Sequence, residues 1–264
     1  NEIFPLKLRL VDVIAILTTV FGIATSLGLG ATQIGAGLYH IFNIDQTPKN
    51  QLIIITVITI MGLASVCLGL DAGIKKLSQL NVIIAGFLLV LVFCLGPSIF
   101  IVNALVQNFG SYLNSLIETA TWTEVYETSS WQDGWTLFYF AWWFAWAPFV
   151  SLFIARISYG RTIKEFIIGV LFVPSLIVFI WMGVFGNAAI HQIINDSSNI
   201  DEVVSGNFAI ALFSLYDIYP GSQQLSILSL ILIITFFVTS SDSGSLVASM
   251  LSSKSQTDIN DSSP

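Results

Sequence analysis

Long apolar runs alternate along the chain with short polar and charged segments. Six runs contain no charged side chain, and they cover 13–44, 51–70, 77–117, 134–155, 166–195 and 218–241. A helix needs about 20 apolar residues to cross a bilayer, and each run supplies that number. The pattern therefore predicts six membrane-spanning helices, at about 12–38, 51–72, 79–103, 134–156, 165–190 and 223–250.

Two further helices are predicted outside these spans. The stretch "IVNALVQNFGSYLNSLIET" at 101–119 has its apolar residues on one stripe and its amides largely off it. This arrangement is typical of an amphipathic helix that lies along a membrane surface. The short apolar patch "FAIALFSLY" at 208–216 predicts a helix in the loop before the last span.

Composition and charge agree with a membrane protein. Only 9% of the residues are charged, against about 25% in soluble domains. If the segment before the first span is cytoplasmic, eight of the nine basic residues lie on the inner side, as membrane proteins favour. These are Lys7, Arg9, Lys75, Lys76, Arg156, Arg161, Lys164 and Lys254; only Lys49 is outside. The outer segments are acidic, so the net charge of −7 gives no indication of a nucleic-acid partner.

The remaining features of composition concern the cysteines and the ends of the chain. Cys67 and Cys94 both fall within spans, so we expect small buried apolar residues and no disulfide. The chain opens without an initiator Met and closes on a polar tail. We expect both ends to be cuts in a longer protein, with 1–264 forming part of one transmembrane domain.

Small residues recur every four positions in the first span, at Gly22, Ser26 and Gly30. Small residues at this spacing let helix backbones approach closely, so the stripe predicts a tight packing surface. A second interpretation adds function: Thr25, Ser26, Thr32 and Gln33 would then face a polar pathway inside the bundle.

The fourth span carries "FYFAWWFAWAPF" at 138–149, with three tryptophans in five positions. A tryptophan in a span usually anchors the interface, but these three lie deeper. At about 100° per residue, Trp142 and Trp146 share a helix face and Trp143 flanks it. Indole faces attract quaternary ammonium groups, which predicts an aromatic cage. Aromatic packing alone is the equally weighted alternative.

The sixth span contains "FFVTSSDSGS" at 236–245, dense in hydroxyls around Asp242. Hydroxyl and carbonyl oxygens suit a small cation, whereas back-bonding of Ser and Thr to their own helix is the structural alternative. An ionisable residue in a membrane span commonly marks a functional site. Asp242 lies near the inner end, however, where it would also reach cytoplasmic water.

A resemblance to a known family rests on these stretches. "GWTLFYFAWWFAWAPFVSLFIARISYGRTIKEF" at 134–166 resembles the signature of the betaine–carnitine–choline transporter family. "FGIATSLGLGATQIGAGL" and "FFVTSSDSGSL" resemble two other family segments, in the family's order. The chain departs from the pattern at Phe140, where the family usually has Trp, and at Tyr159, where it has a basic residue.

The resemblance implies a fold class: an all-α integral membrane protein with part of the inverted-repeat, LeuT-like sodium symporter fold. The chain would hold about six transmembrane helices and the surface helix, but lack the first two and the last two core helices. It would therefore hold about half of a binding site. The family also implies a multi-pass protein of the plasma membrane, the inner membrane in bacteria, and allows a homotrimer.

Site residues follow from position within the family motifs. The resemblance implies that Trp143 and Trp146 hold the substrate, with Trp142 on the access path and Phe140 beside them. It also implies a coupling sodium ion, and no other cofactor. The sodium ligands would be the hydroxyls of Thr239 and Ser240 and the carbonyl of Phe236, with Phe149 near a second cation site.

We therefore expect a secondary transporter of glycine betaine, choline, carnitine or a related osmolyte, driven by sodium through alternating access. A sodium-independent exchanger and a proton-coupled choline transporter are alternatives within the family. A membrane receptor that binds the osmolyte without moving it is an alternative of another class. The spans contain no acid–base pair or metal cluster that would indicate an enzyme.

Overall fold

The computed structural model describes residues 5–67, 75–127, 129–195 and 198–252. Every regular element within these ranges is a helix, and six are long and apolar enough to cross a membrane. They are Val13–Phe42, Pro48–Ser65, Lys75–Leu95, Gln132–Ala155, Ile163–Ile194 and Ser222–Ser245. The predictions of six spans and of an all-helical membrane protein are confirmed.

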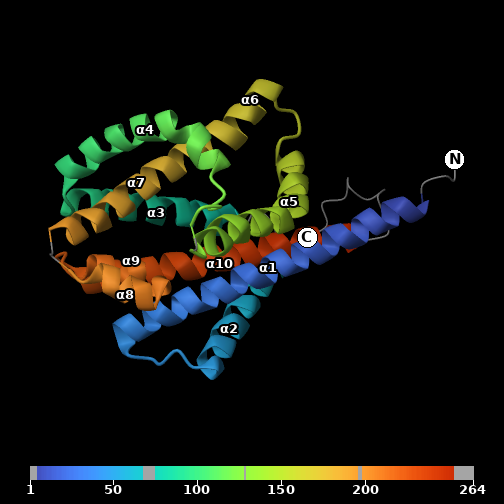
Figure 1. Ribbon diagram of the computed structural model, residues 1–264. Helices are drawn as coiled ribbons and strands as arrows, with labels where there is room; N and C mark the ends of the chain where they lie inside the picture. The colour runs from blue at the N-terminus through green and yellow to red at the C-terminus, as the bar shows by residue number, and fades with distance from the viewer. Residues whose placement is uncertain (1–4, 68–74, 128, 196–197, 253–264) are drawn as a thin grey trace.

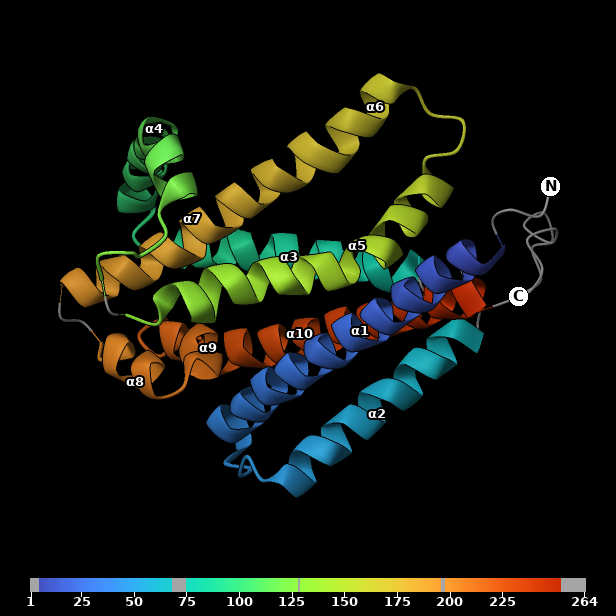
Figure 2. The same cartoon turned by 45° about the vertical axis from the view of Figure 1, so that its right-hand side comes forward.

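Two long helices, α1 (Pro5–Phe42) and α10 (Ser222–Ser252), lie side by side and antiparallel through the bundle (Figures 1 and 2). Glycines permit their close approach. A Cβ atom at Gly30 would lie 2.6 Å from the ring of Phe237, and one at Gly37 would lie 3.0 Å from Leu230 Cδ1; both neighbours are on α10. The predicted packing surface on the first span is confirmed.

Two other helices pack on this pair. α2 (Pro48–Cys67) contacts both α1 and α10. It begins where Thr47 Oγ1 accepts a hydrogen bond of 3.2 Å from the backbone N–H of Asn50, and Pro48 occupies the first turn, where a missing N–H costs nothing. α5 (Phe138–Ile157) contacts α1 and, less extensively, α10.

The third span ends earlier than the sequence predicted. α3 (Lys75–Leu95) stops before Gly96–Pro97, and α4 (Ser98–Thr121) starts directly after them. The predicted span at 79–103 therefore extends too far at its end, because the helix is interrupted at Gly96–Pro97, where Pro97 has no N–H with which to continue it. Ser98 Oγ donates a hydrogen bond of 2.6 Å to the carbonyl of Phe93 and so closes the end of α3.

The predicted amphipathic helix at 101–119 is present as α4, and it lies against α7 (Val173–Ile194) (Figure 1). Ile101 is fully buried, and Asn108 Nδ2 donates a hydrogen bond of 3.2 Å to Asn187 Oδ1 on α7. One edge of the helix thus packs on the bundle, as a covering helix would.

The fifth span is built from three segments: α6 (Ile163–Ile167), a π-helical turn (Ile168–Phe172) and α7. Thr162 and Glu165 form a capping box at its start. The N–H of Val173 bonds to the carbonyl of Ile168, five residues back. Pro174 follows directly, and the wider turn accommodates its missing N–H.

Short helices cover the outer ends of α1 and α10: α8 (Ile200–Gly206), a 3-10 turn (Phe208–Ile210) and α9 (Ala211–Tyr216) (Figure 2). The predicted loop helix at 208–216 is confirmed. Tyr216 is fully buried and its hydroxyl lies 2.9 Å from Ser229 Oγ. Burial raises the pKa of Tyr216 far above its usual range, so the phenol stays neutral.

One expectation about packing is wrong. Cys67 and Cys94 are unpaired, as predicted, but both are exposed rather than buried. The outer surface of a membrane bundle is as apolar as its interior, because it faces lipid. An apolar residue type in a span therefore does not indicate whether the side chain faces lipid or the interior of the bundle.

Candidate functional site

The indoles of Trp142 and Trp146 meet at one serine of the first span. Trp142 Nε1 donates a hydrogen bond of 3.0 Å to Ser26 Oγ, and Trp146 Nε1 donates one of 3.1 Å to the same oxygen. The Ser26 hydroxyl donates in turn to the carbonyl of Gly22 at 2.9 Å. The shared face that helical spacing predicts for the two tryptophans is therefore present, and it is directed at α1.

Gly22 allows the indole of Trp146 to reach the α1 backbone. A Cβ atom at this position would lie 3.0 Å from the Trp146 ring, and Trp146 Nε1 lies 3.1 Å from the Gly22 carbonyl. Because both indole N–H groups are held on α1, the orientations of both rings are set by the packing of α5 on α1. Ser26 thus positions two aromatic faces at once.

Trp143 lies away from this contact. Its side chain is 61% exposed, and its ring contacts are with Tyr139 at 6.4 Å and Phe140 at 5.5 Å. Among the described residues, no ring contact joins Trp143 to Trp142 or Trp146. Phe140 is exposed beside it. The four residues predicted to bind substrate therefore form two groups, Trp142 with Trp146 and Phe140 with Trp143.

Phe149 extends the first group towards the inner end of α5. It is buried, and its ring meets that of Trp146 edge-on at 4.9 Å. Edge-to-face pairs of this kind stabilise the orientation of both rings. The structure thus places Phe149, predicted near a second cation site, directly beside Trp146.

Further rings continue towards the outer end of α5, into the π-helical turn before it (Gln132–Leu137) and beyond. Tyr139 lies 5.8 Å from Trp142 and stacks on Trp135 at 6.0 Å with the ring planes 5° apart. Trp135 stacks on Trp131 at 6.5 Å, and Trp131 lies 5.5 Å from Trp122. The described rings therefore form an unbroken series of contacts from Trp122 to Trp142.

The hydroxyl-rich part of α10 brings together some of the predicted sodium ligands. Thr239 Oγ1 donates a hydrogen bond of 2.9 Å to the carbonyl of Phe236, and half-buried Ser240 follows Thr239 in the helix. Asn81 Nδ2 on α3 donates to Thr239 Oγ1 at 3.4 Å. Threonine side chains in many helices bond in this way to a backbone carbonyl one turn earlier. The contact also places Thr239 Oγ1 close to the carbonyl oxygen of Phe236.

Asp242 is enclosed between helices and does not face water. It is 1% exposed; Ser65 Oγ on α2 donates a hydrogen bond of 2.7 Å to its Oδ2, and Ser243 Oγ one of 3.1 Å to its Oδ1. Of the two environments considered for this residue, the structure shows the buried one. The carboxylate joins α2 to α10.

Sequence reasoning missed two residues of this region, Asn81 and Ser65. Asn81 is buried, and its Oδ1 has no hydrogen-bond partner. Its signal was an amide at the start of an apolar span, since a buried polar group in a span requires a partner. Ser65 gave no comparable signal, because serine is common in spans and only tertiary structure brings it to Asp242.

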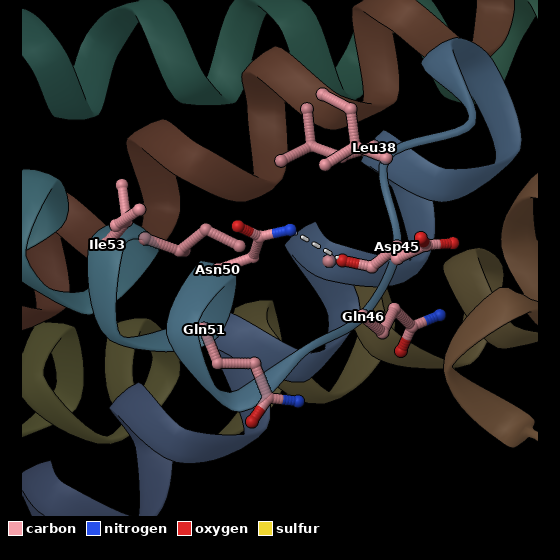
Figure 3. A pocket seen from close by; sticks show the side chains of 9 residues that line it. Leu38, Asp45, Gln46, Asn50, Gln51 and Ile53 are labelled. Carbon is pink, nitrogen blue, oxygen red and sulfur yellow. Dashed lines mark hydrogen bonds between the residues drawn. The ribbon is translucent and has the colours of Figure 1, made fainter.

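A separate cavity of about 240 Å³ opens near the outer end, between the end of α1 and the start of α2 (Figure 3). Asn50 Nδ2 donates a hydrogen bond of 2.8 Å across it to the carbonyl of Asp45. None of the predicted site residues lines this cavity. In the described parts of the chain, no three His, Cys, Asp or Glu side chains gather as a metal site would require.

Six helices long and apolar enough to cross a membrane make this a multi-pass membrane protein, and two indoles are fixed at the contact between two of these helices, α5 and α1. The model of a transporter family, described as the betaine/carnitine/choline family transporter (BCCT), matches residues 6–263. The chain belongs to this family, which consists of transporters and not of enzymes. In bacteria such a protein lies in the inner membrane.

Three relatives illustrate the similarity. A glycine betaine transporter of Acinetobacter baylyi is 41% identical over 93% of this chain and 37% of its own length. A glycine betaine/proline/choline transporter of Vibrio parahaemolyticus is 41% identical over 95% of this chain and 45% of its own length. A glycine betaine transporter of Bacillus subtilis is 40% identical over 93% of this chain and 48% of its own length. The chain thus spans less than half the length of each of these relatives.

Proposed function

We propose that the full-length protein is a secondary transporter that moves a quaternary-ammonium or related zwitterionic osmolyte by sodium-coupled alternating access. Glycine betaine, choline and proline appear in the names of the relatives, and the first two carry a quaternary ammonium group. Such a group has no N–H to donate, so π faces and not acceptors recognise it. The chain supplies these faces on α5.

The single observation that carries the proposal is the shared fixation of Trp142 and Trp146 by Ser26. A cation–π contact requires a ring whose face is held in place, and the indole N–H bonds hold these rings by their edges. Trp143 and Phe140 present further exposed rings on a neighbouring face. We propose that segments of the full-length protein outside this chain complete the cage around these faces.

Sodium coupling is the finer part of the proposal. We assign Thr239, Ser240 and the carbonyl of Phe236 to the ion, with Phe149 near a second cation position. Support comes from the 2.9 Å approach of Thr239 Oγ1 to the Phe236 carbonyl and from the amide of Asn81 next to it. Oxygen-rich sites suit hard cations. Unwound or polar positions of transporter spans commonly bind such coupling ions.

The test separates a transporter from a receptor that only binds. The full-length protein in proteoliposomes is given labelled glycine betaine outside, and retained label is measured with intact vesicles and again after permeabilisation. A transporter releases accumulated label on permeabilisation, and unlabelled choline or carnitine competes with uptake. Label that stays bound after permeabilisation, without accumulation, would instead identify a receptor.

A further inference from the structure

We infer that His40, at the outer end of α1, and Asp217, directly after α9, form an outer latch whose strength is set by the pH of the medium outside. The latch holds the short helices α8 and α9 over the outer ends of α1 and α10 (Figure 2). The inference goes beyond the proposed function, because the latch uses neither the tryptophans nor the assigned sodium ligands. Only its effect on uptake rests on that function.

The latch is an ion pair between two residues far apart in the sequence. His40 Nε2 lies 3.1 Å from Asp217 Oδ1. His40 belongs to the last turn of α1, where the helix dipole favours a positive charge. In the described parts of the chain, no other charged group lies within ion-pairing distance of His40. The strength of the pair therefore depends on whether the imidazole carries a proton.

The ion pair lies beside an apolar contact that joins α9 to α1. Phe213 on α9 is fully buried, and the centroid of its ring lies 5.9 Å from that of the His40 imidazole. A Cβ atom at Gly37, about one turn before His40, would lie 2.5 Å from the same phenyl ring. A change of charge on His40 therefore acts directly where α9 meets the end of α1.

α9 is also bonded to two other spans. Gln192 Nε2 on α7 donates a hydrogen bond of 2.9 Å to the carbonyl of Leu215, and the Tyr216 hydroxyl lies 2.9 Å from Ser229 Oγ on α10. α9 thus connects the outer ends of α1, α7 and α10. A latch that tightens or loosens its hold on α1 consequently bears on all three helices.

The pair is open to the medium, and the carboxylate has a second place to go. The side chains of His40 and Asp217 are 23% and 52% exposed, so water reaches both. Asp217 also lines a cavity of about 210 Å³ together with Ser198, Asn199 and Ser214. Their hydroxyl and amide groups can donate hydrogen bonds to a carboxylate that a neutral histidine holds less firmly. The latch therefore has two available arrangements, as a switch requires.

The direction of the pH effect follows from the chemistry of histidine. Histidine gains its positive charge as the pH falls from about 8 to 5, and a hydrogen bond between charged groups is roughly twice as strong as a neutral one. The latch is therefore strongest in acid and weakens as the pH rises. The other titratable side chains in the outer parts of the elements that meet here are Tyr39, Asp45, Lys49, His191, Asp201, Glu202, Tyr216 and Tyr219.

Hydrogen exchange tests the latch without transport. Exchange of the backbone amides of 208–217 is measured in the full-length protein at about pH 5.5 and pH 8 and corrected for the intrinsic effect of pH on exchange. We expect exchange to be about twofold to fivefold slower at the lower pH, the scale of an exposed ion pair. His40→Gln, which keeps a hydrogen-bond donor but cannot be charged, should remove the difference, and so should Asp217→Asn.

The matched control is His191→Gln on α7. The His191 ring meets that of Phe100 edge-on at 4.9 Å, and in the described parts of the chain it has no carboxylate partner. This variant should keep the pH dependence of the original protein. A pH dependence that persists in His40→Gln, or that is lost equally in His191→Gln, would overturn the inference, whatever the outcome for transport.

Uptake supplies the second arm. In proteoliposomes with a fixed sodium gradient and a fixed inner pH, a tightened latch should lower the maximal rate of glycine betaine uptake about twofold to fivefold at an outer pH of about 5.5 relative to pH 8. His40→Gln should reduce this ratio towards one, whereas His191→Gln should not. An unchanged ratio in His40→Gln would overturn control of transport by the latch. A complete lack of uptake in all three proteins would instead contradict the proposed function and leave the exchange result standing.

Discussion

Trp146 and Ser26 are joined by a hydrogen bond of 3.1 Å from the indole N–H to the serine hydroxyl, across the contact between α5 and α1. The same hydroxyl accepts the indole N–H of Trp142. One small polar side chain thus fixes two rings. Its removal should therefore disturb substrate recognition without removing any aromatic group.

Ser26→Ala should weaken osmolyte binding and lower the free energy of unfolding. The indole of Trp142 would lose its acceptor on α1. An unpaired buried donor costs about 1–3 kcal/mol, and because this N–H is partly buried the loss should lie near the lower end of that range. Substrate affinity and thermal unfolding of the full-length protein in detergent measure the two effects. Thr25→Ala is the control, because within the described part of the chain the Thr25 hydroxyl bonds to its own helix, at the carbonyl of Phe21. Equal losses in both variants would argue against a positioning role.

Trp143→Leu should weaken substrate binding by about 2 kcal/mol, the scale of a desolvated cation–π contact. The fold should be little affected, since the side chain is mostly exposed in this chain. Isothermal titration of the full-length protein with glycine betaine gives the affinity. Phe144→Leu changes the adjacent exposed ring and should leave it unaltered; an unchanged affinity in Trp143→Leu would remove this residue from the cage.

Gly30→Ala should destabilise the protein, whereas Gly28→Ala should not. A Cβ atom at Gly30 meets the Phe237 ring at 2.6 Å, while one at Gly28 meets nothing within 4 Å. Overpacking typically costs about 1–3 kcal/mol, and Ala favours a helix over Gly by about 1 kcal/mol. Thermal unfolding should therefore shift in opposite directions in the two variants. A shift in the same direction would contradict the close approach of α1 and α10.

Ser65→Ala should lower the free energy of unfolding by about 1–3 kcal/mol, because it leaves Asp242 Oδ2 buried without its donor. The present bond is 2.7 Å long and joins α2 to α10. Chemical denaturation of the full-length protein measures the change. Thr59→Ala, on an exposed position of the same helix, is expected to have little effect. A loss of similar size there would indicate a general effect on α2.

Much of the fold follows from the sequence because lipid imposes strong rules. Charge-free length predicts the spans, and the four-residue spacing of Gly22, Ser26 and Gly30 correctly indicates the packing surface of α1. The end of the third span was misplaced, because apolar character continues through Gly96–Pro97 into α4 although the helix stops. Hydropathy measures burial from water and contains no information about where a helix is interrupted.

The site was predicted in its residue types but less well in its arrangement. Helical spacing predicts the shared face of Trp142 and Trp146, whereas the side of α5 that packs on α1, and with it the exposure of Trp143, is set by tertiary packing. The partners Ser65 and Asn81 lie more than 150 residues before the α10 groups that they contact. Contacts over such separations are set by tertiary packing, which local patterns do not report.

Sodium-driven uptake tests the central claim most directly. Proteoliposomes containing the full-length protein are loaded without sodium, and the uptake of labelled glycine betaine is followed with an imposed inward sodium gradient, with an inward proton gradient, and with neither. We predict accumulation with the sodium gradient alone. Thr239→Ala should require more sodium for half-maximal uptake, while Thr235→Ala, which removes an equivalent back-bond one turn earlier, should not. Accumulation that ignores sodium in all three proteins would contradict sodium coupling and leave the α10 hydroxyls as helix-packing groups.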